Sequence, residues 1–203
     1  MIMLFVSILY SLVLAFNIPT LYQGAKVSVV ENNIYFSKQD NSVSIKPFFA
    51  TFIICAGVVP CWLVSHSYGL TFFIALFGSA AYIDYVTRWV PDILIFALSW
   101  IALSTVMPGE FDAAPVLVSA AVMVIPCLVV NVIAIMRCQR PALASGDIYL
   151  LPAIGVWLRP EWGAACLVTS FLLAGLGGLR YQNIPFVTVI YPVFVVAVIC
   201  NAQ

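Results

Sequence analysis

Long apolar runs, separated by short polar or proline-containing breaks, cover most of this chain. They form eight segments, at residues 2–22, 48–65, 70–86, 91–107, 115–136, 148–158, 162–179 and 186–200. A helix needs about 20 residues, and about 17 at the least, to cross the hydrocarbon core of a membrane. The pattern therefore predicts an all-α, polytopic bundle of about eight hydrophobic segments in an integral membrane protein.

One segment is too short for this role. The run at 148–158 cannot cross a membrane by itself. It must extend backward through Gly146 and Asp147, or lie where the membrane is thin or covered by protein. The segment that is too short therefore begins beside an acidic residue, Asp147.

The first segment and the stretch after it set the domain plan. Residues 2–22 have no basic region and no cleavage site before Asn17, so we expect a retained transmembrane helix rather than a signal peptide. The only sizeable hydrophilic stretch, 23–47, is expected to be a short cytoplasmic loop, either flexible or a small strand pair. We expect one membrane domain over 1–203.

Positive charge is distributed unevenly between the ends of these segments. With 23–47 placed in the cytoplasm and the sides alternating from there, only Arg159 among the basic residues falls outside. Cytoplasmic loops concentrate Lys and Arg, so we prefer this assignment, which puts the N-terminus and the C-terminus outside. The residues inside are Lys26, Lys38, Lys46, Arg88, Arg137, Arg140 and Arg180.

Composition excludes several classes of function. Hydrophobic residues make up 64% of the chain and charged residues 8%, far below the quarter or so of a soluble domain. The formal net charge is zero, so a basic face for nucleic acid is not expected. The six cysteines form no C-x-x-C pair, which disfavours a zinc site and leaves a Cys61–Cys200 disulfide open. They are Cys55, Cys61, Cys127, Cys138, Cys166 and Cys200. We expect neither a metal nor a cofactor.

Two acids lie at the same predicted face. Asp84 ends the third segment and Asp147 begins the sixth, and both ends are cytoplasmic in the assigned topology. Ionisable residues at a membrane are costly and usually functional. Two neighbouring carboxyls share a proton, so one can activate water while the other polarises a peptide carbonyl. This chemistry needs no histidine, and the single one, His66, is expected on the outer face.

Each acid also has a structural interpretation. Asp84 could pair with Arg88, four residues on, and Asp147 could be the N-cap of an apolar helix. Asp92 follows Pro91 and fits the first turn of a helix, where a negative charge complements the dipole; for Asp92 we favour this role. Because Asp84 and Asp147 both lie on the cytoplasmic side of the membrane in the assigned topology, we favour a catalytic pair.

Three motifs stand out between residues 84 and 186: Asp84-Tyr-Val-Thr-Arg-Trp-Val-Pro91-Asp92, Ala144-Ser145-Gly146-Asp147 and Asn183-Ile184-Pro185-Phe186. The first two resemble the two aspartate motifs of the type IV prepilin peptidases, a group of GxGD aspartyl proteases. The third is similar to the element that opens the last helix of that family. The resemblance runs from about Thr71 to the C-terminus.

The resemblance implies a multi-pass aspartyl endopeptidase of the bacterial inner membrane. Its substrate would be a prepilin or pseudopilin with a short basic leader, a glycine before the cut and an apolar helix after it. Asp84 and Asp147 would be catalytic. Gly146 would let the backbone approach closely, and Pro91, Asp92 and Pro185 would support the site. The lipid bilayer is the other expected partner, and the oligomeric state is left open.

The chain departs from the family pattern at three places. Ala144 replaces the first glycine of GxGD, and Tyr149 replaces a basic residue usually found after the second aspartate. The family's large cytoplasmic domain is replaced by 23–47, which puts its second activity, methylation of the new N-terminus, in doubt. Two other functions stay open: an impaired relative that serves as an assembly subunit of a pilus or secretion machine, and a transporter with the acids as ion relays.

The charge asymmetry makes a testable prediction about topology. Single-cysteine probes within 25–45 and 137–146 should react with impermeant thiol reagents only from the cytoplasm, because basic residues concentrate there. Probes within 108–114 should react only from outside. Labelling of 137–146 from outside would place Asp147 on the wrong face for cytoplasmic leader removal.

Overall fold

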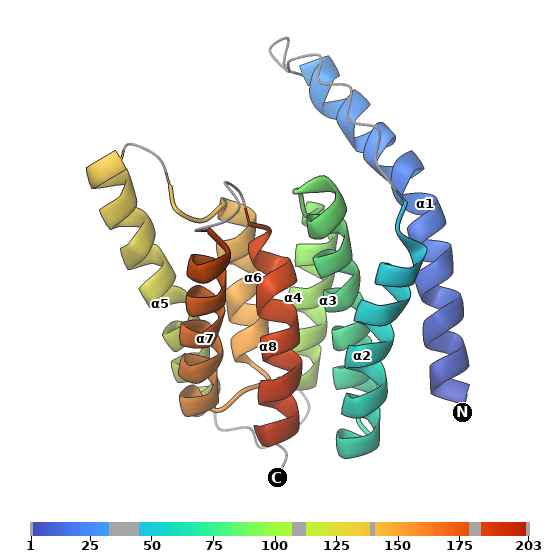
Figure 1. Cartoon of the computed structure of the whole chain (residues 1–203). Helices are drawn as coiled ribbons and strands as arrows, with labels where there is room; N and C mark the ends of the chain where they lie inside the picture. Colours follow the sequence, from blue (N-terminus) through green and yellow to red (C-terminus); the bar gives the residue numbers. More distant parts are fainter. Residues whose placement is uncertain (1, 33–44, 107–112, 139–140, 179–183, 202–203) are drawn as a thin grey trace.

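The structure, a computed structural model, describes residues 2–32, 45–106, 113–138, 141–178 and 184–201, and all its regular elements there are α-helices. The helices are α1 (Ile2–Asn32), α2 (Pro47–Ser65), α3 (Tyr68–Thr87), α4 (Asp92–Val106), α5 (Ala113–Cys138), α6 (Ser145–Gly155), α7 (Pro160–Gly178) and α8 (Phe186–Asn201). They stand side by side as a bundle (Figure 1). Each predicted apolar segment corresponds to one helix.

Five helices of the described chain are long and apolar enough to cross a membrane. The spans are Ile2–Tyr22, Pro47–Ser65, Tyr68–Thr87, Ala114–Arg137 and Pro160–Gly178. Two further helices, α4 and α8, are apolar but shorter. The prediction of an all-α, polytopic helical bundle is confirmed.

Two helix boundaries differ from the expected segments. Helix α1 continues past residue 22 to Asn32, so the first part of the stretch predicted as a loop is helical. No proline interrupts residues 23–32, and extending an existing helix is much easier than starting one. The rest of the predicted loop, 33–44, lies outside the described residues. Helix α6 begins at Ser145, and so extends backward through Gly146 and Asp147, but it ends at Gly155 and its 11 residues are still too few to cross a membrane.

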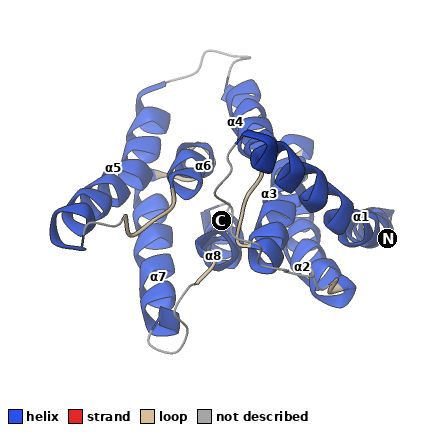
Figure 2. Cartoon of the chain, turned by 90° about the horizontal axis from the view of Figure 1, so that it is seen from above, coloured by secondary structure: helices blue, strands red, loops and turns tan. Residues whose placement is uncertain are grey.

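The helices pack in two groups that meet at α4 and α8. Helices α1, α2 and α3 pack in chain order, while α5 packs against α6 and α7. Helix α8 lies between α3 and α7, and α4 lies between α3 and α6. This arrangement is visible along the helix axes in Figure 2. The end of α3 and the starts of α4, α6 and α8 gather at the upper end of the bundle in Figure 1, opposite the start of α1 and the end of α8.

A buried tyrosine fixes the position of α8. The Tyr191 hydroxyl donates a hydrogen bond of 3.1 Å to the carbonyl oxygen of Ile53 on α2. A methyl group at either Gly57 or Gly78 would overlap this hydroxyl. Two glycines on α2 and α3 therefore open the space that the Tyr191 ring occupies, so α8 can pack closely against both helices.

A third glycine brings α6 against α5. A methyl group at Gly155 would lie 2.8 Å from the Cα of Ala120 and 3.0 Å from the carbonyl oxygen of Ser119. Any larger side chain would push the two helix backbones apart. The spacing of α5 and α6, and with it the position of Asp147 at the start of α6, depends on this contact.

Hydroxyl groups join α1 to the bundle. Tyr10 and Ser79 form a hydrogen bond of 2.8 Å between α1 and α3, and Ser11 and Thr51 form one of 2.9 Å between α1 and α2. Polar contacts of this kind stabilise helix pairs in membranes, where apolar surface gives no preference for protein over lipid.

The disulfide left open by the sequence is not formed. Cys61 and Cys200 are both free thiols in the structure. Cys61 is buried among the apolar core residues, where a free cysteine behaves as a small hydrophobic side chain.

Candidate active site

A cavity of about 810 Å³ opens at the upper end of the bundle. Its walls come from the end of α3, the start of α4, the segment leading into α6, the last turns of α7 and the start of α8. Asp84 and Asp147 both line it. The structure thus brings together two acids that lie far apart in the sequence and on different helices.

Asp84 lies in the last turn of α3 and is only 6% exposed. Its Oδ2 accepts a hydrogen bond of 3.2 Å from the backbone N–H of Thr188, in the first turn of α8. N–H groups at a helix start have no partner within their own helix, and the helix dipole favours a negative charge there. Asp84 therefore caps α8 from a neighbouring helix.

Thr188 is a site residue that the sequence did not reveal. Its hydroxyl donates a hydrogen bond of 2.8 Å to the carbonyl oxygen of Ala81 and lies 3.4 Å from the Asp84 carboxylate. These contacts tie α8 to the last turns of α3. A threonine near the start of an apolar run predicts only a helix beginning. Its partner, 104 residues earlier, is set by the packing of α8 against α3.

Asp147 occupies the first turn of α6, after the N-cap residue Ala144. The interpretation of Asp147 as the N-cap is therefore wrong. Its carboxyl instead lies near the backbone N–H of Ala144, the reverse half of a capping box. Helix α6 is too short to be a span. Burial, and then the charge of Asp84, raise the pKa of Asp147 to about 7, so this carboxyl is protonated in a substantial fraction of molecules at neutral pH.

The residues predicted to support the site fall into two groups. Gly146, Asp92 and Pro185 line the cavity, whereas Pro91 does not. A methyl group at Gly146 would meet only the Ile95 side chain, at an ordinary 3.5 Å, so no close backbone contact at this position requires glycine. Asp92 lies in the first turn of α4, as its helix-dipole interpretation predicts, and also faces the cavity.

Two departures from the family pattern have little effect on the cavity. Ala144 has φ −66° and ψ 151°, an extended conformation that any residue adopts, so a glycine is not needed there. Tyr149 is exposed and is not part of the cavity wall.

Asn131 holds the segment that leads into α6. From α5, its Oδ1 accepts a 2.7 Å hydrogen bond from the Leu143 N–H, and its Nδ2 donates a 3.0 Å bond to the Leu143 carbonyl. Both polar groups of one backbone residue are thus satisfied by a single side chain. The sequence carried a signal for this residue, because an asparagine inside an apolar run is costly unless it is hydrogen-bonded.

Other polar residues lie apart from the cavity or on its rim. Arg88 forms the C-cap of α3 in a left-handed conformation, with φ 56°, and lines the same cavity as Asp84. The ion pair between Asp84 and Arg88, considered as a structural role for Asp84, would therefore lie within this cavity. His66 is the C-cap of α2, at the opposite end of the bundle (Figure 1). Among the described residues, no group of three His, Cys, Asp or Glu side chains could hold a metal ion.

The comparison with known families identifies the class of protein. A polytopic helical bundle with two acids in one cavity is what an intramembrane aspartic peptidase requires. A model of the type IV leader peptidase family, which is of the aspartic peptidase type, matches residues 70–179, more than half of the chain. The chain therefore belongs to the type IV leader peptidase family. No curated protein and no solved structure gives a match.

The matched region runs from the start of α3 to the end of α7 and contains both aspartate motifs. The recognition made from the motifs is confirmed. The Ile184-Pro185-Phe186 element lies beyond the match, but the structure places these residues in the cavity wall. Asn183 lies outside the described residues. Helices α1 and α2 precede the matched region.

The contact at Asn131 makes a prediction about activity. Asn131→Leu leaves the Leu143 N–H and carbonyl without partners, at a cost of roughly 1–3 kcal/mol, and loosens the segment before Asp147. We expect kcat for leader cleavage to fall about 10- to 100-fold. Asn131→Asp keeps only the hydrogen-bond acceptor, so its kcat should lie between those of the wild type and Asn131→Leu.

The control is Ser11→Ala, which removes a hydrogen bond between helices remote from the cavity. It should cleave at the wild-type rate. Accumulation in the membrane, measured by immunoblot, shows whether each variant inserts. Wild-type kcat in Asn131→Leu would mean that the Leu143 contact does not position Asp147.

Proposed function

We propose that this protein is a membrane aspartyl endopeptidase that removes the short basic leader of type IV prepilin-like proteins at the cytoplasmic face of the bacterial inner membrane. The family membership supports leader peptidase activity in general. One observation supports the site most directly: Asp84 and Asp147, from helices in different halves of the bundle, line one cavity.

The surroundings of the two acids favour different roles. Asp84 accepts a hydrogen bond from the start of α8, which stabilises its ionised form. Burial and the charge of Asp84 keep a substantial fraction of Asp147 protonated at neutral pH. We therefore assign Asp84 as the general base and Asp147 as the general acid, an assignment that the sequence leaves open.

The reaction then follows with protons accounted for. Asp84 takes a proton from water as the water oxygen attacks the scissile carbonyl, while the Asp147 proton passes to the carbonyl oxygen. The tetrahedral intermediate collapses and its C–N bond breaks. The proton on Asp84 passes to the leaving amine, and the hydroxyl proton returns to Asp147. The two acids end in their initial states, and no metal takes part.

The two alternative functions are less well supported by the geometry. A transporter needs acids along a path through the bilayer, whereas these two lie at one end of the bundle. An impaired relative is suggested by Ala144 and Tyr149. The backbone at Ala144 is ordinary and Tyr149 lies outside the cavity wall, so neither departure changes the shape of the cavity.

The catalytic pair is tested by replacing each acid. Asp84→Asn and Asp147→Asn keep size and hydrogen bonding but cannot exchange the catalytic proton. We expect leader removal to fall by at least roughly 10²- to 10⁴-fold in each variant. Co-expression with a candidate prepilin, followed by gel analysis of its leader, gives the measurement.

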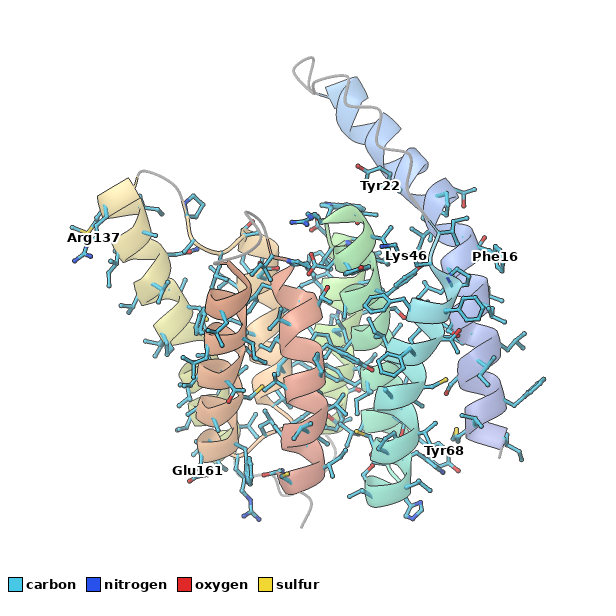
Figure 3. The ribbon with its side chains drawn as sticks, in the orientation of Figure 1. Phe16, Tyr22, Lys46, Tyr68, Arg137 and Glu161 are labelled. Atoms are coloured by element: carbon cyan, nitrogen blue, oxygen red, sulfur yellow. The ribbon has the colours of Figure 1, made fainter. Side chains whose placement is uncertain are left out.

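Glu161→Gln is the control, because it changes an acid in the first turn of α7, at the end of the bundle opposite the cavity (Figure 3). It should still cleave, and all three variants should accumulate in the membrane. Full processing by Asp84→Asn or Asp147→Asn would remove that residue from the catalytic pair.

The cleaved product offers a separate prediction. A methyl donor needs its own binding surface, and the stretch 23–47 has no C-x-x-C pair to build a small metal domain. We expect substrate cleaved by this protein to keep an unmodified N-terminal amine. Mass spectrometry of the mature pilin, in cells without another such peptidase, measures this. A methyl-sized mass increment on the first residue would show that the membrane bundle itself methylates.

A further inference from the structure

A second cavity, of about 390 Å³, lies beside the first at the same end of the bundle. We call it the α1–α4 groove. One wall is formed by α1, the other by the first turn of α4, and its floor by the last turns of α3. Almost all of its lining is apolar. Its residues are Leu14, Ile18, Leu21, Tyr22, Ile83, Thr87, Trp89, Pro91, Asp92, Ile93 and Leu94.

The groove and the cavity of the two acids share a wall. Trp89 and Asp92 line both. Elsewhere the last turn of α3 separates the groove from the cavity, because Ile83 faces the groove and the next residue, Asp84, faces the cavity. A substrate chain that leaves the groove past Trp89 therefore enters the cavity that contains the proposed base, Asp84.

We infer that the α1–α4 groove binds the apolar segment of the substrate that follows the cut. This rests on the proposed leader peptidase function. The α1 wall from Leu14 to Tyr22 covers eight helical steps, or about 12 Å. That length matches about two turns of an apolar helix. The scissile bond would then lie above the groove, where it crosses Trp89 into the cavity.

Charge complementarity supports this occupant. Asp92, at the junction, is the one acid of the groove lining, which contains no basic residue. The start of a substrate helix carries a partial positive charge from its free N–H groups, which a nearby carboxylate stabilises. After cleavage the same end carries an ammonium group. A lipid chain would match the apolar walls but would have no such use for Asp92.

The groove joins two parts of the chain. Its α1 wall precedes the matched region, residues 70–179, whereas its α4 wall and both acids lie within that region. Helix α1 therefore completes a surface for the substrate beside the cutting site. Figure 3 shows Tyr22 on the side of α1 that faces the bundle and Phe16 on the side that faces away.

Filling the groove tests the inference. Ile93→Trp and Leu21→Trp place a larger ring in it, and both positions are exposed enough, at 75% and 61%, to accept one. The controls are Phe96→Trp and Phe16→Trp, on the same helices with similar exposure, 65% and 62%, but outside the groove. Each is assayed with a full-length prepilin and with a soluble peptide that ends a few residues after the cut.

We expect the groove variants to raise KM for the full-length prepilin roughly tenfold, a loss of about 1.4 kcal/mol in binding. Their kinetics with the short peptide should be unchanged, and the controls should match the wild type with both. Equal impairment with both substrates, or none with either, would overturn the inference. Failure of the wild type to cleave any prepilin would instead contradict the proposed function.

Crosslinking decides the occupant even without cleavage. A photoreactive benzoylphenylalanine at position 93, in an Asp84→Asn background that retains substrate, should crosslink to the apolar segment of a prepilin. The same probe at position 96 should not. Crosslinks from position 93 only to lipid, or only to a second copy of this chain, would assign the groove to that occupant and reject the substrate.

Discussion

A carboxylate removed from water must be hydrogen-bonded or lose its charge, and the upper end of this bundle satisfies that requirement for Asp84 with another helix. The start of α8 provides the backbone N–H of Thr188, which itself has no partner within α8. One contact thus meets two demands, because it satisfies both the acid and the helix end. It also means that the acid stays in place only while α8 stays packed against α3.

Small residues make that packing close enough. Gly57 and Gly78 leave the space that Tyr191 fills, and Tyr191 anchors α8 to the Ile53 carbonyl on α2. On the other side of the cavity, Gly155 brings α6 against α5, and Asn131 holds the backbone before Asp147. Each acid is therefore positioned from outside its own helix. Such support limits how far the two carboxyls can move relative to each other, which is what shared proton chemistry requires.

The last turn of α3 divides two environments. On one face Asp84 lines a cavity that contains acids and backbone polar groups, and on the adjacent face Ile83 lines an apolar groove. A peptidase that cuts at a membrane surface must handle a polar leader and an apolar helix in one chain. Two neighbouring spaces of opposite character, joined at Trp89 and Asp92, offer a physical means of doing so.

Much of this was determined by the sequence alone. Apolar run lengths depend only on composition along the chain, so they predicted the eight helices, and local motifs predicted the family. Alternation of the segments placed Asp84 and Asp147 at one end, because consecutive helices must reverse direction. The predicted end of α1, at residue 22, was wrong because residues 23–32 contain no proline and the existing helix continues through them. Thr188, Asn131 and the roles of the glycines were decided only by the tertiary structure. Their partners lie on other helices, and a contact between helices depends on how close and at what rotation they pack, which no local pattern encodes.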